Sequence, residues 1–577
     1  MFEKSPRSSS SSTAGISSRI IGQEDESLEL NPSNAVNNTS SIDITSSEHI
    51  QNHLHHQSNG DLKNSRIKGR GRTIKMILLT QNIAAVQFTW SVELAYGTPY
   101  LLGLGLSKSL MSLVWLAGPL AGLLVQPLVG ALSDNSTSRF GRRRPYVVVG
   151  SLAVVASFIS IGWTKEIVNC FFNKETADIV AMWLAVFSLY VLDFAVNAVM
   201  AGCRALIVDS LPPSQQEEGT AWAGKMVGIG SVIGYFMGYI NLVHFFPFLG
   251  NTQLQVLCVL ASIILILSDI FTCWAISEKV YKDGSSTSTS IWNSIIEVSY
   301  SIAKSFHSLP KQIQLLCNVQ LFAWMGWFPF LFYSTTWVAE LYIHSQNSNL
   351  PPSVIKDDGE RAGSFSLLLF SIVSMTASFI LPFLVSSSSI SIPLKFAWDQ
   401  FLRLPLVFLS LPKLWTLSHF IFAFAMLATW YVTIPVQANF IIALCGISWA
   451  VAMWAPFSII GEFASKRSKI SDHCLDDSSS PIRRSRSSIH SNNNDNGSDT
   501  GTLLGIHNIY IVIPQFIATF FSSVAFALLE NPTSSTINDS SHSHSDLNAG
   551  ADSIGFVLRC GGCMAIVAGF LSMKLWK

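Results

Sequence analysis

The chain has 577 residues, of which 49% are hydrophobic and only 12% are charged, about half the charged fraction of a typical soluble protein. Its 36 basic and 36 acidic residues give a formal net charge of zero, so no basic field would attract nucleic acid. These values exclude a soluble enzyme, a nucleic-acid-binding protein and a disordered scaffold, and they predict a polytopic membrane protein.

Residues 1–72 are rich in Ser, Asn and His and contain too little apolar surface to fold, so we expect a disordered cytosolic tail. The first residues contain no apolar stretch, and we therefore expect no cleavable signal peptide. Basic residues close the tail just before the first apolar run, which predicts that the N-terminus lies inside: Lys68, Arg70, Arg72 and Lys75.

The rest of the chain is a series of apolar segments, each long enough to span a bilayer as a helix of roughly 20 residues. We expect an all-α membrane protein with twelve transmembrane helices in two six-helix bundles, 73–276 and 313–577, joined by a cytosolic linker, 277–312. The second bundle would carry a disordered cytosolic loop, 466–501, and an external loop, 531–551. The predicted spans are 76–102, 109–132, 145–163, 179–207, 222–245, 254–276, 313–337, 364–386, 415–433, 435–463, 503–529 and 552–575.

The distribution of basic residues supports this topology, because cytosolic loops of membrane proteins are enriched in Lys and Arg. The predicted external loops contain only Lys108, Lys165, Lys174, Lys356 and Arg361, whereas the cytosolic segments contain many more. We expect both termini in the cytosol. The expected location is the plasma membrane, with a vacuolar membrane as the alternative.

Several ionisable residues lie inside the predicted spans, where each would cost about 2.5–3.5 kcal/mol to insert. Asp193, Asn197 and Arg204 fall on one face of the fourth span, at about 0°, 40° and 20° around the helix. Asp193 and Arg204 are separated by roughly 16 Å along the axis and so do not pair directly. This pattern predicts a polar stripe that lines a wet path or faces polar partners on other helices.

A carboxyl group in such a site can gain a proton on one side of the membrane and release it on the other, since burial disfavours its charged form. Asp193 is the first candidate for proton coupling. Glu93, in the first span, is a second candidate, or alternatively a structural partner of Arg204. Arg204 does not usefully titrate, so its expected role is to bind hydroxyl oxygens of a solute or to pair with a carboxylate.

Aromatic residues near Glu93 suggest a sugar, which presents both C–H faces and hydroxyl groups. Trp90 and Tyr100 are therefore candidates for substrate binding, together with Asn197 and Arg204. Ordinary helix packing is the alternative explanation for each aromatic residue.

The loop between the second and third spans resembles the cytosolic motif of the major facilitator superfamily. It reads Gly-Ala-Leu-Ser-Asp at 130–134 and Arg-Phe-Gly-Arg-Arg-Arg-Pro at 139–145. The resemblance implies the fold of that superfamily. It also implies a cytosolic gate made by Asp134, Gly141, Arg142, Arg143 and Arg144.

Further stretches resemble the sucrose transporter family, within the glycoside–pentoside–hexuronide type of cation symporters. They are Gln87–Trp90 with Thr98–Tyr100, Leu192–Asp209, and Leu309–Trp337. The resemblance implies proton-coupled uptake of a disaccharide such as sucrose or maltose by alternating access. It assigns the proton to Asp193 and substrate coupling to Arg204.

Two departures from the plant members of that family point to a fungal-type α-glucoside carrier with broader selectivity. Plant members have a neutral residue at the position of Glu93. They also have two aspartates after the seventh-span aromatic run, where this chain reads Tyr-Ser-Thr-Thr at 333–336.

We therefore expect a proton-coupled importer of α-glucoside disaccharides that acts as a monomer in the lipid bilayer. Its partners would be a small sugar and a proton, with no nucleic acid, no cofactor and no metal. The alternatives are a transporter-like sugar sensor and a facilitator of another small sugar, such as a monosaccharide. An enzyme is not expected, because Cys560 and Cys563 lie in an apolar span without a second ligand pair.

Overall fold

The computed structural model describes residues 66–134, 136, 138–278, 309–346, 351–385, 410–476, 495–529 and 544–576. These residues belong to one unit, Asn64–Lys577. Most of the predicted N-terminal tail, most of the predicted linker, and the middle of both long predicted loops of the second bundle lie outside the described residues.

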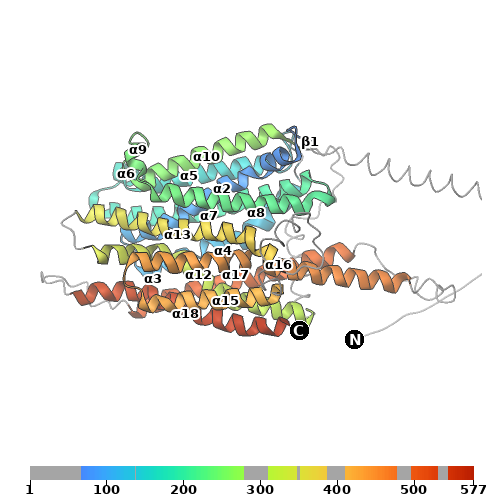
Figure 1. Ribbon diagram of the computed structural model, residues 1–577. Helices are drawn as coiled ribbons and strands as arrows, with labels where there is room; N and C mark the ends of the chain where they lie inside the picture. Colours follow the sequence, from blue (N-terminus) through green and yellow to red (C-terminus); the bar gives the residue numbers. More distant parts are fainter. Residues whose placement is uncertain are drawn as a thin grey trace, which may run out of the picture. The chain divides into compact units, whose positions relative to one another are not determined.

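The first half consists of long helices joined by short ones (Figure 1). The long helices are α2 (Arg72–Gly103), α4 (Ala117–Asp134), α5 (Arg144–Gly162), α7 (Lys174–Ser210), α8 (Gln216–Tyr239) and α10 (Gln253–Ala275). The short ones are α3 (Lys108–Val114), α6 (Thr164–Phe171), η1 (Pro213–Gln215) and α9 (Leu242–Phe245).

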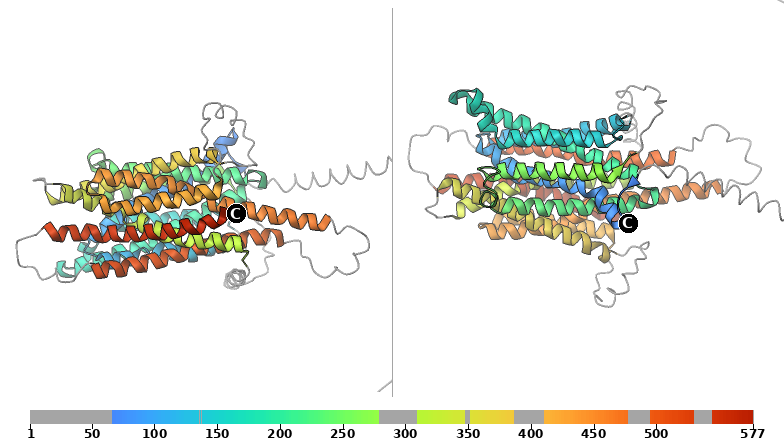
Figure 2. Two further views of the ribbon diagram at one scale, coloured as in Figure 1. Left: turned by 60° about the horizontal axis from the view of Figure 1, so that its bottom comes forward. Right: turned by 90° about the horizontal axis from the view of Figure 1, so that it is seen from above.

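The second half repeats this pattern with α12 (Lys311–Ser345), α13 (Pro352–Leu384), α15 (Leu411–Ala428), α16 (Pro435–Asp476), α17 (Asp495–Leu529) and α18 (His544–Ser572). Two 3₁₀ turns, η3 (Thr429–Tyr431) and η5 (Met573–Trp576), follow α15 and α18. The end of α16 projects beyond the neighbouring helices (Figure 2). Helical backbone thus extends into both ends of the loop expected at 466–501.

Ten helical segments among the described residues are long and apolar enough to cross a membrane. The other two predicted spans coincide with α2 and α8, which are helices of 32 and 24 residues. Each predicted span thus falls mainly on helical backbone, although 109–132 is divided between α3 and α4, and 222–245 between α8 and α9.

Small residues allow several of these helices to approach closely. Gly230 of α8 faces the backbone carbonyl of Ala84 in α2, at a distance that leaves no room for a Cβ atom. Gly326 of α12 and Gly561 of α18 meet backbone to backbone in the same way. Such close contacts between small residues are the usual way in which membrane helices pack.

The start of the described chain is attached to the end of the first half. Strand β1 (Arg66–Ile67) pairs antiparallel with β2 (Ile276–Ser277), directly after α10. The amide of Lys68 also donates to the carbonyl of Ala275 at 2.8 Å. Composition predicts disorder for these first residues, because a two-residue strand leaves no signature in composition.

The two halves contact each other at the end of the bundle where α2 and α12 finish. Ser109 of α3 donates to the carbonyl of Ser523 in α17 at 3.0 Å, and Thr98 of α2 donates to the carbonyl of Phe332 in α12 at 3.0 Å. Lys108 lies 3.0 Å from the carboxylate of Glu340. Because α2 starts at the predicted cytosolic side, this contact region lies at the predicted external side.

Candidate functional site

The polar stripe of α7 is present, and its members differ in exposure. Asp193 and Asn197 lie near the middle of the helix and are only 3% and 4% exposed, whereas Arg204, nearer the helix end, is exposed. Asn197 donates from its amide to the carbonyl of Asp193 at 2.9 Å, one helical turn away. The stripe therefore runs from a buried centre to an accessible end.

A small-residue face of α4 covers the buried part of the stripe. Gly118, Gly122 and Gln126 recur every four residues and so share one side of the helix. A Cβ atom on Gly118 would lie 3.9 Å from a carboxyl oxygen of Asp193, and one on Gly122 would lie 3.9 Å from the amide oxygen of Asn197. Gln126 donates to that same oxygen at 2.8 Å.

Glu93 of α2 lies beside Asp193, with the two carboxyl groups close enough for their charges to interact. Glu93 is 3% exposed, and neither of its carboxyl oxygens has a hydrogen-bond partner in the described part of the chain. The expected pairing of Glu93 with Arg204 is not formed in this structure. Arg204 is about 16 Å further along α7 than Asp193, so Glu93 cannot contact both.

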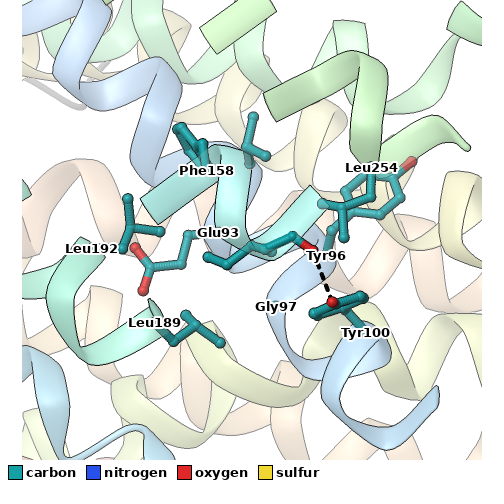
Figure 3. Close-up of a pocket in the computed structure, with 10 residues that line it drawn as sticks. Glu93, Tyr96, Gly97, Tyr100, Phe158, Leu189, Leu192 and Leu254 are labelled. Carbon is teal, nitrogen blue, oxygen red and sulfur yellow. Dashed lines mark hydrogen bonds between the residues drawn. The ribbon is translucent and has the colours of Figure 1, made fainter. Parts of the chain in front are cut away.

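A small cavity next to Glu93 lies between α2, α5, α7 and α10, inside the first half (Figure 3). Its walls are mainly apolar, and the carboxylate of Glu93 points toward Leu189 and Leu192 (Figure 3). The cavity volume is about 20 Å³, which is room for about one water molecule and not for a sugar.

The two aromatic candidates of α2 occupy different environments. Tyr100 lines the cavity beside Glu93, and its hydroxyl donates to the carbonyl of Ile161 at 2.8 Å (Figure 3). Trp90 is half-buried and lies one turn before Leu94, whose carbonyl accepts from Thr335 of α12 at 3.4 Å. Trp90 is therefore on the face of α2 that is directed toward the second half.

The arginines of the loop before α5 bind two carboxylates. Arg142 and Arg143 donate to one oxygen of Asp209, at the end of α7, at 2.6 and 2.8 Å. Arg144 lies 3.4 Å from Glu278, which follows β2. The side chain of Asp134, the expected acidic partner, lies outside the described residues.

Glu278 also binds the backbone at the start of α5. The amides of Arg143 and Arg144 donate to its carboxylate at 2.7 and 3.0 Å, and the amide of Arg142 donates to it as well. A carboxylate at a helix N-terminus satisfies amides that have no partner within the helix and interacts favourably with the helix dipole. Gly141 adopts a φ of +113° just before this site, a conformation that side chains other than hydrogen disfavour.

Sequence reasoning missed Gln126, Glu278 and the role of Asp209. Gln126 had a signal, because it continues the four-residue spacing of two glycines in an otherwise apolar span. Asp209 lies at the end of a predicted span, where a solvated side chain is the ordinary expectation. Glu278 had no signal, since its contact with the loop depends on how α10 packs against α5.

The structure resembles solved membrane transporters over most of its length. It matches a bacterial homologue of the human lysosomal transporter Spinster with a TM-score of 0.54 and 11% identity, covering 88% of this chain and 97% of that chain. A structure described as a proton-dependent oligopeptide transporter gives a TM-score of 0.54 and 10% identity, covering 88% and 99%. At these identities the likeness shows the fold.

Sequence comparisons find closer relatives. The general alpha-glucoside permease of Schizosaccharomyces pombe is 35% identical over 557 residues, covering 86% of this chain and 92% of the permease. The sucrose transport protein SUT1 of Oryza sativa subsp. japonica is 29% identical over 468 residues, covering 77% and 80%.

The family model of the Major Facilitator Superfamily matches residues 76–471, more than half of the chain. This confirms the predicted multi-pass membrane fold, and the relatives are permeases, as expected, and not enzymes. The chain belongs to the Major Facilitator Superfamily, in the group that contains the Schizosaccharomyces pombe permease and the Oryza sativa sucrose transport proteins.

Proposed function

We propose that this protein imports α-glucoside disaccharides, such as sucrose and maltose, together with protons by alternating access. The names of its relatives support the substrate class, because one is a general alpha-glucoside permease and another is a sucrose transport protein. The protein would act as a monomer in the plasma membrane, with both termini in the cytosol.

The observation that carries this proposal is the buried pair of carboxyl groups at Glu93 and Asp193. Two like charges this close in a medium of low dielectric repel strongly, so the pair is most stable when it holds at least one proton. Entry of water from one side would allow that proton to leave. Such a pair is the minimum requirement for coupling solute movement to a proton gradient.

The sugar would bind along the stripe between Asp193 and Arg204. Asn197 and Gln126 offer amide groups, and Arg204 offers a planar set of donors that suits hydroxyl oxygens. Trp90 would stack on a C–H face of the sugar ring from the side of α2. Tyr100, whose hydroxyl is already bonded to Ile161, would contribute only its ring.

The loop before α5 would act as the cytosolic gate, with Arg142 and Arg143 bound to Asp209, and with Arg144 and the turn at Gly141 held by Glu278. Asp134 would complete this gate. The contacts between the halves at the external side, together with the exposure of Arg204 near the cytosolic side, support a state that is closed toward the outside and open toward the cytosol.

The test is uptake of labelled sucrose, maltose and glucose by proteoliposomes with an imposed proton gradient, with and without a protonophore. We expect the disaccharides to accumulate and the protonophore to prevent accumulation. Asp193→Asn should abolish accumulation and leave sugar exchange across the membrane. Uptake of glucose alone, insensitive to the protonophore, would instead identify a monosaccharide facilitator, and full accumulation by Asp193→Asn would refute the proton assignment.

A further inference from the structure

Gln515 of α17 reaches from the second half to the carboxyl site of the first. The amide nitrogen of Gln515 lies 3.3 Å from the position that a Cβ atom on Gly118 would occupy. Both carboxyl oxygens of Asp193 lie within 4.0 Å of the same position. The absence of a side chain at Gly118 therefore leaves a gap on which groups from both halves converge.

The environment of Gln515 leaves its amide available. Its side chain is half-buried in an otherwise apolar stretch of α17, and the described part of the chain provides no hydrogen bond to its amide group. The backbone carbonyl, by contrast, accepts from Thr519 at 2.6 Å, which stabilises this turn of the helix. Because the side chain is only half-buried, water can reach this amide, and a sugar hydroxyl can take the place of that water.

The position of Gln515 relative to Asp193 suits a sugar hydroxyl. An amide offers both a donor and an acceptor, and a hydroxyl can use both at once. Asp193 and Asn197 belong to α7, and Gln126 belongs to α4, so these partners all move with the first half. A ligand that also binds Gln515 would hold the two halves together. Its binding would thereby change the surroundings of the carboxyl pair.

We propose that Gln515 is a substrate-binding residue of the second half, which donates to or accepts from one hydroxyl group of the sugar across the gap at Gly118. Sugar binding would draw α17 toward Asp193 and exclude water from the carboxyl pair. The residue would thus contribute both to selectivity and to coupling. This inference rests on the proposed function.

The experiment compares wild type with Gln515→Ala in proteoliposomes, using a set of sucrose and maltose analogues that each lack one hydroxyl. In the wild type, removal of the hydroxyl that binds Gln515 should raise KM by about tenfold, the value of a well-formed hydrogen bond. Gln515→Ala should raise KM for the intact sugar by a similar factor. For this variant, removal of the same hydroxyl should not raise KM further, whereas the other analogues should still have a higher KM than the intact sugar.

A matched control is Gln320→Ala, which removes an amide of α12 that is buried against His507 at 2.9 Å. This variant should change stability while keeping the wild-type pattern across the analogues. Gly118→Ala should weaken binding in the same direction as Gln515→Ala, because the added methyl group fills the gap.

The outcomes separate the inference from the proposed function. If wild type accumulates no disaccharide in a protonophore-sensitive way, the proposed function fails. If wild type transports as proposed and Gln515→Ala discriminates among the analogues as wild type does, only the role of Gln515 is overturned. A shift in the pH profile of uptake with unchanged discrimination would also overturn it, since Gln515 would then act on Asp193 alone.

Discussion

The ammonium group of Lys108 lies 3.0 Å from the carboxylate of Glu340, which joins the start of α3 in the first half to the end of α12 in the second. Both side chains are mostly buried, at 13% and 20% exposure. Ser109 and Ser523 bond to each other next to this ion pair. In the proposed carrier, opening toward the outside would require all of these groups to separate.

We expect Lys108→Ala to favour the state that is open to the outside. Because the pair is mostly buried, the gain should exceed the roughly 1 kcal/mol of an exposed pair, which is a shift in population of at least about fivefold. A suitable probe is Thr98→Cys, because Thr98 is fully buried at the same contact. Both proteins carry Cys170→Ser, which removes an exposed cysteine. An impermeant thiol reagent should then label the cysteine introduced at position 98 faster, by the same factor, when Lys108→Ala is present.

The charge-reversed pair, Lys108→Glu with Glu340→Lys, should return labelling toward the wild-type rate. Lys165→Ala serves as the control, since it removes an exposed lysine on the same, predicted external side. Equal labelling in wild type and Lys108→Ala would show that the ion pair does not hold the halves together.

Glu93 should be coupled energetically to Asp193 and not to Arg204. We expect the effects of Glu93→Gln and Arg204→Gln on kcat/KM for maltose uptake to add within about 0.5 kcal/mol, because the two groups are far apart. Glu93→Gln and Asp193→Asn should be strongly non-additive, since each removes one member of the same pair. If the effects of Glu93→Gln and Asp193→Asn add, and those of Glu93→Gln and Arg204→Gln do not, Glu93 instead forms a structural salt bridge with Arg204.

Gln126 should orient Asn197 for binding. Gln126→Ala removes the bond of 2.8 Å to the amide oxygen of Asn197, which leaves that side chain held only by its own bond to the carbonyl of Asp193. We expect KM for disaccharides to rise by about three- to tenfold with little change in kcat, the effect of one lost neutral hydrogen bond. Gln81→Ala is the matched control, because Gln81 bonds to α10 at Ser268 and Thr272. An equal KM effect in both variants would contradict this prediction.

Gly141→Ala should destabilise the loop before α5. Its φ of +113° disfavours a side chain, and a Cβ atom there would lie 3.0 Å from Glu278 and from Arg144. We expect the free energy of unfolding to fall by about 1 kcal/mol or more. This should appear as a lower unfolding temperature of the detergent-purified protein.

The control for this change is Gly130→Ala, at a helical position where a Cβ atom would meet nothing within 4 Å. Because alanine is the better helix former, that variant should be neutral or slightly stabilising. A similar loss of stability in both variants would show that the positive φ at residue 141 does not require glycine.

The helices and the polar face of α7 could be predicted from the sequence, because both depend on local periodicity. The predicted spans fall mainly on helical backbone, and Asp193 and Asn197 lie one turn apart on the same face of α7. The break between the ninth and tenth spans is also local: η3 ends at Tyr431, and Pro435 begins α16.

The partners of these residues could not be predicted, since they depend on which helices pack together. Nothing in the sequence indicates that Glu93 of α2 meets Asp193 and leaves Arg204 to solvent. Gln515 lies more than 300 residues after Asp193 in the sequence, yet both converge on Gly118. Trp327, an aromatic residue of the predicted seventh span, packs into the core of the second half, with ring centroids 4.1 Å from Phe422 and 5.0 Å from Trp449.

The size of the cavity beside Glu93 has a consequence for proton leakage. A continuous file of waters through the bilayer would let protons run down their gradient without cargo and waste the driving force. A space for about one water can relay a proton over a single step and cannot form such a file. In the proposed carrier, the tight apolar walls around Glu93 would therefore prevent protons from crossing the membrane without a sugar.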